Sequence, residues 1–363
     1  MKSLNQLIIT LMACLFSIQA WAQSGKLFNT DNQLSSNLAT QVFQDKSGFI
    51  WIATRNGLNT YDGYYITVMK KDMSNFSGLK SNYINSIAQD DKGHILLGTN
   101  NSLLEFTGSE FHKIPMLDSK GEELATYVKQ VYPLKNKDVA VATSGYGIMI
   151  KKKDAQECHA MKGEVEKLKY IHKLLEDKRG RLWIITEDGK LYRKETNGRV
   201  TSHFVGTEGV DAQDIQQDVL GNLYLASKNQ GVHLLRAGSN VFTRISSIGN
   251  MPIENIYISR NNKLYIGCDG LGIYVYDPQT GFLQDNPLFS RLVNLAKSKV
   301  TSIIEDNQGN IWVSMLQKGV FMQSNIQNDF NYMGFRLGSR NVIGENCVTS
   351  LSINQGNQVW VGT

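Results

Sequence analysis

The sequence contains few of the residues on which catalytic centres, metal sites and disulfide frameworks depend. Its 363 residues include four cysteines, five prolines and six histidines. The histidines are scattered, and none belongs to an HExxH motif, a GxSxG motif or a phosphate-binding glycine loop. An active site needs an acid, a base, a nucleophile or a metal that converge in space. The sequence therefore predicts no catalytic residue, no metal site and no cofactor.

Long hydrophobic runs are equally scarce. One mostly apolar run, residues 7–18, follows a positively charged start and precedes an A-x-A cleavage pattern at residues 20–22. This arrangement predicts a secretion signal over residues 1–22, with Gln23 as the first mature residue. A lipoprotein site at Cys14 is the weaker alternative, because the apolar run continues past that cysteine. No other run approaches the ~18 apolar residues that span a bilayer, so we expect an exported domain.

The cysteines that follow the signal form no framework. They are Cys158, Cys268 and Cys347, an odd number without a close pair. Cys268 lies in a strand pattern and is expected to be a buried thiol. Cys158 and His159 are adjacent, but two neighbouring ligands without a partner cluster do not predict a metal site.

Charge of either sign is nearly balanced. The formal net charge is +5, from 38 basic and 33 acidic residues, and loss of Lys2 with the signal leaves 37 basic residues and hence +4. For an exported domain, this small excess does not indicate a nucleic-acid partner. At most it slightly favours anionic sugars.

What the sequence does contain is a repeat. Asp, a short Gly turn and a strand that ends in Trp-Ile-x-Thr recur about eight times, first in QDKSGFIWIATRNGL at residues 44–58. The residues at the Thr position are Thr54, Thr99, Thr143, Thr186, Ser227, Cys268, Met315 and Thr363. Their spacing is 41 to 48 residues, and several short strands per unit at this period are typical of propeller blades. The sequence therefore predicts an all-β fold, a seven-bladed β-propeller of four-stranded antiparallel blades plus the start of an eighth repeat.

Turn chemistry places the strands of the first repeat. The predicted strands cover residues 39–44, 49–54, 58–61 and 64–69. Asp45 to Gly48 forms the first turn, and Asp62-Gly63 is a hairpin signal. Because the Asp and Gly of the turn recur between blades, we expect them to be structural rather than catalytic. The third repeat lacks the Gly turn and the Trp, so its boundaries stay open, and its charged segment 151–169 is expected to form an outer strand and a solvated loop.

Four tryptophans share one register of the repeat. They are Trp51, Trp183, Trp312 and Trp360, and the other units have Leu96, Ala140, Tyr224 and Tyr265 there. Because these substitutes share apolar bulk rather than chemistry, the position is expected to pack between neighbouring blades. Stacking of the tryptophans on a sugar is the less favoured interpretation.

Recognition is expected in the loops that differ between blades. Loops that join second to third strands, and those that lead into the innermost strands, lie on one face around the central funnel of a propeller. Sugar recognition needs aromatic faces and planar polar side chains. His172 begins an innermost strand and could face the funnel, although a structural role is the better prediction. The predicted ligand-binding residues are Arg55, Asn56, Tyr83, Tyr127, Tyr146, Tyr170, His172, Asp269 and Lys318.

The segment LSSNLATQVFQDKSGFIWIATRNGLNTYDG, residues 34–63, and its later copies resemble two-component regulator propeller repeats. The resemblance covers nearly the whole mature chain and is strongest in the first, fourth and seventh units. Such repeats form the periplasmic sensor of hybrid two-component systems in Bacteroides-type gut bacteria. The resemblance implies two seven-bladed propellers followed by an immunoglobulin-like Y_Y_Y domain, a membrane helix, a histidine kinase and often a receiver with an AraC-type DNA-binding domain. It also implies a homodimeric receptor that senses oligosaccharides released from glycans.

The domain organisation follows from the repeat and the resemblance. We expect a signal at residues 1–22, the propeller at 23–335 and the start of a second propeller at 336–363. Thr363 falls at the end of the second strand of an eighth unit, so we expect the sequence to be part of a longer receptor. The outer strand of the seventh blade has two candidates, residues 26–29 and residues 330–335, and both keep seven blades.

The sequence thus predicts a periplasmic, non-enzymatic ligand-sensing propeller. Its expected partners are an oligosaccharide, the second propeller and the Y_Y_Y domain of a parent chain anchored in the inner membrane, and its kinase lies outside this chain. One alternative is an exported propeller enzyme that acts on polysaccharide, such as a lyase, which His172 beside a Tyr and an Arg in a deep funnel would favour. A second alternative is a scaffold that binds no ligand and mediates dimerisation.

Overall fold

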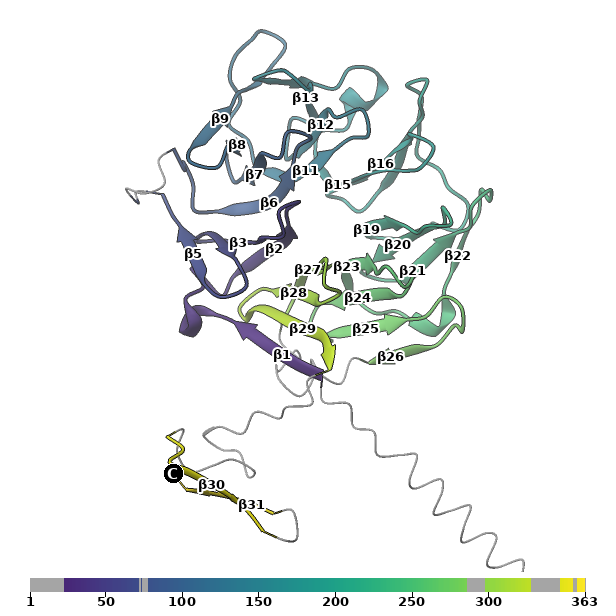
Figure 1. Cartoon of the computed structure of the whole chain (residues 1–363). Coiled ribbons are helices and arrows are strands. Elements are labelled where there is room, and N and C mark those ends of the chain that lie inside the picture. Colours follow the sequence, from purple (N-terminus) through teal and green to yellow (C-terminus); the bar gives the residue numbers. More distant parts are fainter. Residues whose placement is uncertain are drawn as a thin grey trace, which may run out of the picture. The chain divides into compact units, whose positions relative to one another are not determined.

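The computed structural model describes residues 23–71, 73, 78–285, 298–327, 347–354 and 358–362. Residues 25–325 form one compact unit, in which seven sheets surround a central axis as the blades of a propeller (Figure 1). The predicted all-β, seven-bladed architecture is confirmed. The predicted signal at 1–22, the candidate strand at 330–335 and Thr363 lie outside the described residues.

Each blade begins with a strand beside the axis. The innermost strands are β2 (Ala39–Gln44), β6 (Ile84–Gln89), β11 (Val128–Pro133), β15 (Ile171–Glu176), β19 (Ala212–Gln217), β23 (Ile253–Ile258) and β27 (Val300–Glu305). The second strands are β3 (Ile50–Thr54), β7 (Ile95–Thr99), β12 (Val139–Thr143), β16 (Leu182–Thr186), β20 (Leu223–Ser227), β24 (Leu264–Cys268) and β28 (Ile311–Met315). In all seven blades, the residue at the Thr position of the repeat is the last residue of the second strand.

Two further strands complete each blade toward the rim. The third strands are β4 (Gly57–Tyr61), β8 (Leu103–Phe106), β13 (Ile148–Lys151), β17 (Leu191–Lys194), β21 (Gly231–Leu235), β25 (Ile273–Tyr276) and β29 (Gly319–Gln327). The outer strands are β5 (Ile66–Met69), β9 (Phe111–Ile114), β14 (Cys158–Ala160), β18 (Val200–Thr201), β22 (Phe242–Arg244), β26 (Leu283–Asp285) and, in the seventh blade, β1 (Gln23–Phe28). In the first blade the predicted strands differ from these bounds by at most two residues at one end.

The Asp of the repeat builds the turn between the first and second strands, as predicted. Oδ1 of Asp45 accepts the backbone N–H of Ser47 at 2.9 Å and that of Phe49 at 3.0 Å. Its Oδ2 accepts the indole N–H of Trp51 at 2.8 Å, a bond that the sequence analysis did not foresee. The same indole bond recurs between Asp177 and Trp183 and between Asp306 and Trp312. The turn is thereby joined to the packing between blades.

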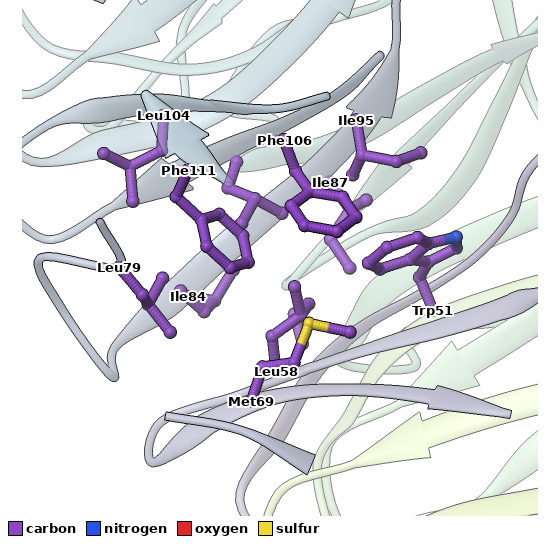
Figure 2. Close-up of a cluster of buried hydrophobic side chains, with 12 residues drawn as sticks. Trp51, Leu58, Met69, Leu79, Ile84, Ile87, Ile95, Leu104, Phe106 and Phe111 are labelled. Atoms are coloured by element: carbon purple, nitrogen blue, oxygen red, sulfur yellow. The ribbon is translucent and has the colours of Figure 1, made fainter. Parts of the chain in front are cut away.

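The tryptophan register packs between neighbouring blades, as predicted. Figure 2 shows Trp51 of the first blade among Ile87, Ile95 and Phe106 of the second. The rings of Trp51 and Phe106 meet edge to face with centroids 5.7 Å apart, a geometry that aromatic pairs prefer. Trp183 and Trp312 are also buried. A sugar cannot stack on these three rings without opening the core.

The N-terminal strand closes the ring. β1 is hydrogen-bonded to β29, so the seventh blade takes its outer strand from residues 23–28, which precede the first blade in the sequence (Figure 1). Phe28 at the end of β1 is fully buried. Its ring lies 5.3 Å from that of Trp312 and 4.9 Å from that of Tyr61 of the first blade. The sequence allowed two outer strands for the seventh blade. Among the described residues, the one that includes residues 26–28 takes this place.

The third blade departs from the repeat in its turn and in its outer part. Lys137 has a φ of 71° and takes the turn position that Gly48, with a φ of 96°, holds in the first blade. A short strand, β10 (Met116–Leu117), pairs parallel to β14 and makes this blade five-stranded. The charged segment 151–169 supplies the outer strand, as predicted, but it is not all solvated. Val165 is buried there.

The helices of the described residues are single 3₁₀ turns. They are η1 (Thr30–Asn32), η2 (Glu164–Lys167) and η3 (Ser246–Ile248). Over the described residues, no helix has the length and apolar character needed to cross a membrane. Cys268, at the end of β24, is fully buried, and burial raises the pKa of its thiol to about 12. This confirms the predicted buried thiol.

A separate two-stranded sheet belongs to a second compact unit. It consists of β30 (Ser350–Ile353) and β31 (Val359–Gly362), which pair antiparallel. Trp360 lies in β31 and is 65% exposed. The prediction that it packs between blades stays a prediction, because the hairpin β30–β31 is the only sheet of this second unit among the described residues.

Phe28→Ala tests whether β1 closes the ring. Truncation of a fully buried ring leaves a cavity beside Trp312 and Tyr61, so we expect the free energy of unfolding to fall by about 3–5 kcal/mol. Chemical denaturation followed by tryptophan fluorescence measures the change. Phe282→Ala is the matched control, because Phe282 is 63% exposed and its loss should change stability by less than about 0.5 kcal/mol. Equal effects of the two substitutions would contradict closure by β1.

Candidate functional site

A central funnel of about 480 Å³ is lined by residues from all seven blades. In every innermost strand, the pairing with the second strand shifts register between the first and third residues, as in a β-bulge. The second residue is left out of the ladder, and in every blade it lines the funnel. These seven bulge residues are Thr40, Asn85, Lys129, His172, Gln213, Glu254 and Thr301.

The third residues of the innermost strands have a different task, because they join neighbouring blades. The side-chain oxygen of Gln41 accepts the backbone N–H of Ile87 in the next blade at 2.8 Å. The other acceptors are Ser86 for Val131, Gln130 for Leu174, Asp214 for Ile256, Asn255 for Ile303 and Ser302 for Val42. In the fourth blade, Lys173 cannot accept and instead pairs with Asp214 at 3.0 Å. We call these contacts the inner-strand bridges.

The funnel lining is rich in cations. It includes Arg55, Lys129, Lys173, Lys228 and Lys299. Three of them are paired. Lys129 lies 3.4 Å from Glu187, Lys173 pairs with the buried Asp214, and Lys299 pairs with Glu254. Arg55 and Lys228 have no carboxylate within ion-pair distance among the described residues.

His172 lines the funnel as a neutral imidazole. Its pKa is lowered to about 4, mainly by burial and also by the positive charges of Lys173, Lys129 and Lys228, while a hydrogen bond to the backbone of Gln213 acts in the opposite direction. A general base is most effective when its pKa lies near the working pH. At neutral pH, His172 is therefore a hydrogen-bonding group and a weak base.

An aromatic sector lies beside Arg55. The guanidinium of Arg55 lies over the ring of Tyr83 at 5.3 Å, and the rings of Tyr83 and Tyr127 meet edge to face at 6.1 Å. The Tyr127 hydroxyl donates to Oδ1 of Asn85 at 2.8 Å. Burial and the contact with Tyr83 raise the pKa of Tyr127, so its phenol stays protonated. This sector offers aromatic surface, a cation and an amide at one side of the funnel.

The structure brings together some of the predicted ligand-binding residues. Arg55, Tyr127 and His172 line the funnel. The ring of Tyr83 contacts Arg55 and Tyr127. Asp269 reaches the edge of the funnel, where it lies 3.8 Å from Lys299. Six of the nine predicted residues therefore lie outside the funnel lining; besides Tyr83 and Asp269 they are Asn56, Tyr146, Tyr170 and Lys318.

Most of the charged residues in the lining are not among the predicted ligand-binding residues. Lys129 and Glu254 occupy the same strand position as His172, one residue after the start of the innermost strand. The rule that placed His172 at the funnel would have found both. Lys228 follows the last residue of β20, as Arg55 follows that of β3, so the loop register that selected Arg55 would have found Lys228.

One group away from the funnel has the composition of a metal site. The ligand atoms of Asp90, His94 and Glu105 lie within 4.8 Å of one another. Nδ1 of His94 lies 3.2 Å from Glu105 and 3.7 Å from Asp90. His94 stands four residues after the turn Asp, where Asn310 and Arg181 bind the turn carboxylate of their own blades. This parallel assigns His94 to bracing the turn.

Fold and lining define a seven-bladed propeller with a polar, partly basic funnel. Residues 33–56, 78–101 and 294–317 match the family model described as two component regulator propeller. The segments span the first two strands of the first, second and seventh blades. The sequence resemblance was strongest in the first, fourth and seventh units. The family model matches the first and seventh of these, matches the second blade as well, and does not match the fourth. Over these three segments the chain is therefore similar to two-component regulator propeller repeats.

Solved structures share the fold. The extracellular domain assigned to a hybrid two-component system of B. thetaiotaomicron is 21% identical, with a TM-score of 0.72 over 94% of this chain and 47% of that chain. Another extracellular domain from B. thetaiotaomicron is 16% identical, with a TM-score of 0.69 over 93% of this chain and 46% of its own. This chain thus spans about half the length of these domains.

An enzyme shares the fold as well. A catalytically inactive form of virginiamycin B lyase from Staphylococcus aureus, with quinupristin, is 13% identical, with a TM-score of 0.63 over 84% of this chain and 99% of that chain. No curated protein sequence matches this chain. At these identities the structural matches establish the fold and leave the chemistry to the site.

The pKa of His172 can be tested by NMR titration of its imidazole. We expect a midpoint of about 4 in the folded protein, against 6.5 for an unperturbed histidine. Because the unfolded chain then binds a proton that the folded protein does not, this residue makes stability fall as the pH falls from 6.5 toward 4. The same part of the pH dependence should disappear in His172→Gln. A folded-state midpoint near 6.5 would contradict the burial of this ring among cations.

Proposed function

We propose that this propeller is the ligand-sensing part of a periplasmic hybrid two-component receptor. It responds to oligosaccharides released from glycans and signals to a histidine kinase outside this chain. The observation that carries the proposal is the match of three blades to two-component regulator propeller repeats. The extracellular domains assigned to two-component systems of B. thetaiotaomicron, which have the same fold, support it.

The funnel has the composition that a saccharide site requires. Its bulge residues include the uncharged hydrogen-bonding side chains of Thr40, Asn85, Gln213 and Thr301. The aromatic sector at Tyr127 supplies apolar surface beside them. Sugar recognition combines such surfaces with a few placed polar groups, and a volume of about 480 Å³ is in the range of small-ligand pockets.

The proposed domain order is a signal at residues 1–22, this propeller at 23–335 and a second propeller that begins at 336–363. The first strand of the ring starts at Gln23, directly after the proposed cleavage position. The hairpin β30–β31 repeats the first turn of a blade, since the N–H of Asn354 donates to the carbonyl of Gln358 at 3.1 Å. The parent receptor would add a Y_Y_Y domain, an inner-membrane anchor and a dimer partner.

A lyase is the second candidate function. His172, Tyr127 and Arg55 line the same funnel, which is the arrangement that an eliminating enzyme would use, and virginiamycin B lyase has the same fold. Elimination needs a base, however, and the pKa of His172 is lowered to about 4 while the Tyr127 phenol stays protonated. The chemistry of the lining therefore favours binding. Depolymerisation of a polyuronate by this chain, lost in His172→Gln, would reverse this preference.

The gene itself tests the signalling part of the proposal. The DNA that follows codon 363 is expected to continue in frame into a second propeller, a Y_Y_Y domain, a membrane helix and a histidine kinase. Sequencing of the locus measures this directly. A stop codon at this position would refute signalling through a kinase in the same polypeptide.

A further inference from the structure

We infer that the funnel takes an anionic oligosaccharide, with carboxylate or sulfate groups, and that Arg55 and Lys228 bind these groups. The inference rests on the proposed function, since it names the class of saccharide that this ring would bind. It follows from the two lining cations that have no carboxylate partner among the described residues, rather than from the modest net charge of the chain.

Most charged side chains of the lining form ion pairs. Each lining carboxylate has a lysine within ion-pair distance: Glu187 has Lys129, and Glu254 has Lys299. Lys173 is neutralised by Asp214. After these pairs are formed, the cations left in the lining are Arg55 and Lys228. An unpaired cation in a concave site attracts anions, because the low-dielectric walls of a cleft focus its field.

Arg55 and Lys228 hold equivalent positions in two distant blades. Each follows the last residue of a second strand, β3 in the first blade and β20 in the fifth. The first and fifth blades lie on different sides of the axis (Figure 1), so the two charges face the funnel from separate directions. Two separated anionic groups on one molecule fit this arrangement better than a single small anion.

The groups around the two cations suit sugar hydroxyls. His172 is neutral and can both donate and accept, and the amides of Asn85 and Gln213 do the same. The ring of Tyr127 offers apolar surface at the Arg55 side. A free sulfate or phosphate would leave these groups and most of the volume of the funnel unused, which favours an acidic oligosaccharide over an inorganic anion.

Calorimetric titration of the chain with trigalacturonate, a chondroitin sulfate tetrasaccharide and neutral cellotetraose tests the inference. We expect at least one acidic probe to bind, cellotetraose not to bind, and the affinity to fall with added salt. Arg55→Gln and Lys228→Gln should each raise the Kd about 10-fold or more, because each removes a charge-assisted hydrogen bond. Arg55→Lys, which keeps the charge, should retain most of the affinity.

Matched controls separate the site from general charge effects. Arg199→Gln removes an exposed arginine in the turn between β17 and β18, and Lys92→Gln removes a lysine in the turn between β6 and β7. Neither residue lines the funnel, so neither change should alter the Kd by more than about 2-fold. Arg55 and Lys228 are themselves exposed, so their variants are expected to fold, which thermal denaturation checks.

Each remaining outcome overturns the inference in an identifiable way. Binding of cellotetraose as tightly as the acidic probes would refute the anionic class and leave oligosaccharide sensing standing. Equal affinity for sodium sulfate or monomeric glucuronate would reduce the site to one for a small anion. Failure of both acidic probes to bind refutes the inference, whereas the in-frame kinase expected after codon 363 stands or falls separately.

Discussion

The ring depends on how each blade satisfies the inner edge of its first strand. An innermost strand pairs with only one neighbour, so its other edge carries backbone N–H groups that the core would otherwise bury without a partner. Each such loss costs about 1–3 kcal/mol. The inner-strand bridges solve this for Ile87, Val131, Leu174, Ile256, Ile303 and Val42, each of which donates to a side chain of the preceding blade. The same bonds hold neighbouring blades together. The contacts that pair the free strand edges therefore also close the ring.

A second set of bridges lies at the other end of the innermost strands. The side chains of Gln44, Gln89 and Gln217 accept backbone N–H groups of Asn307, Lys46 and Lys178 in the preceding blade. The bulge residues precede both sets along each strand and make no contribution to the ladder. Three of them still join blades, because Thr40, Asn85 and Thr301 each donate to a backbone carbonyl of the next blade. The blade therefore divides the residues of one strand between positions that the ladder fixes and a bulge position that differs from Thr to Lys to Glu.

This division explains what could be predicted from the sequence. The turn Asp, the Gly and the Trp recur because they build the turn and the packing between blades, and the repeat located the last residue of every second strand. The prediction of interblade packing held for Trp51, which reaches into the second blade, and for the buried Trp183 and Trp312. Arg55, Tyr127 and His172 were placed by loop and strand register. Tyr146 and Tyr170 share that kind of register, but they lie outside the funnel, since loop conformation decides where a rim side chain points.

Charge could not be predicted in the same way, and Lys173 shows why. By sequence it is a lysine at the start of an innermost strand, next to His172, and it would count as a ligand-binding cation. In the structure it occupies a bridging position, where six blades have an acceptor, and it is bound to Asp214. Asp214 is fully buried and also accepts from Asn255 and from the backbone of Ile256. Lys173 therefore belongs to the interface between the fourth and fifth blades. The cations available to a ligand are those that are not used in ion pairs within or between blades. Only the fold determines these pairs, so the sequence alone does not reveal which cations remain.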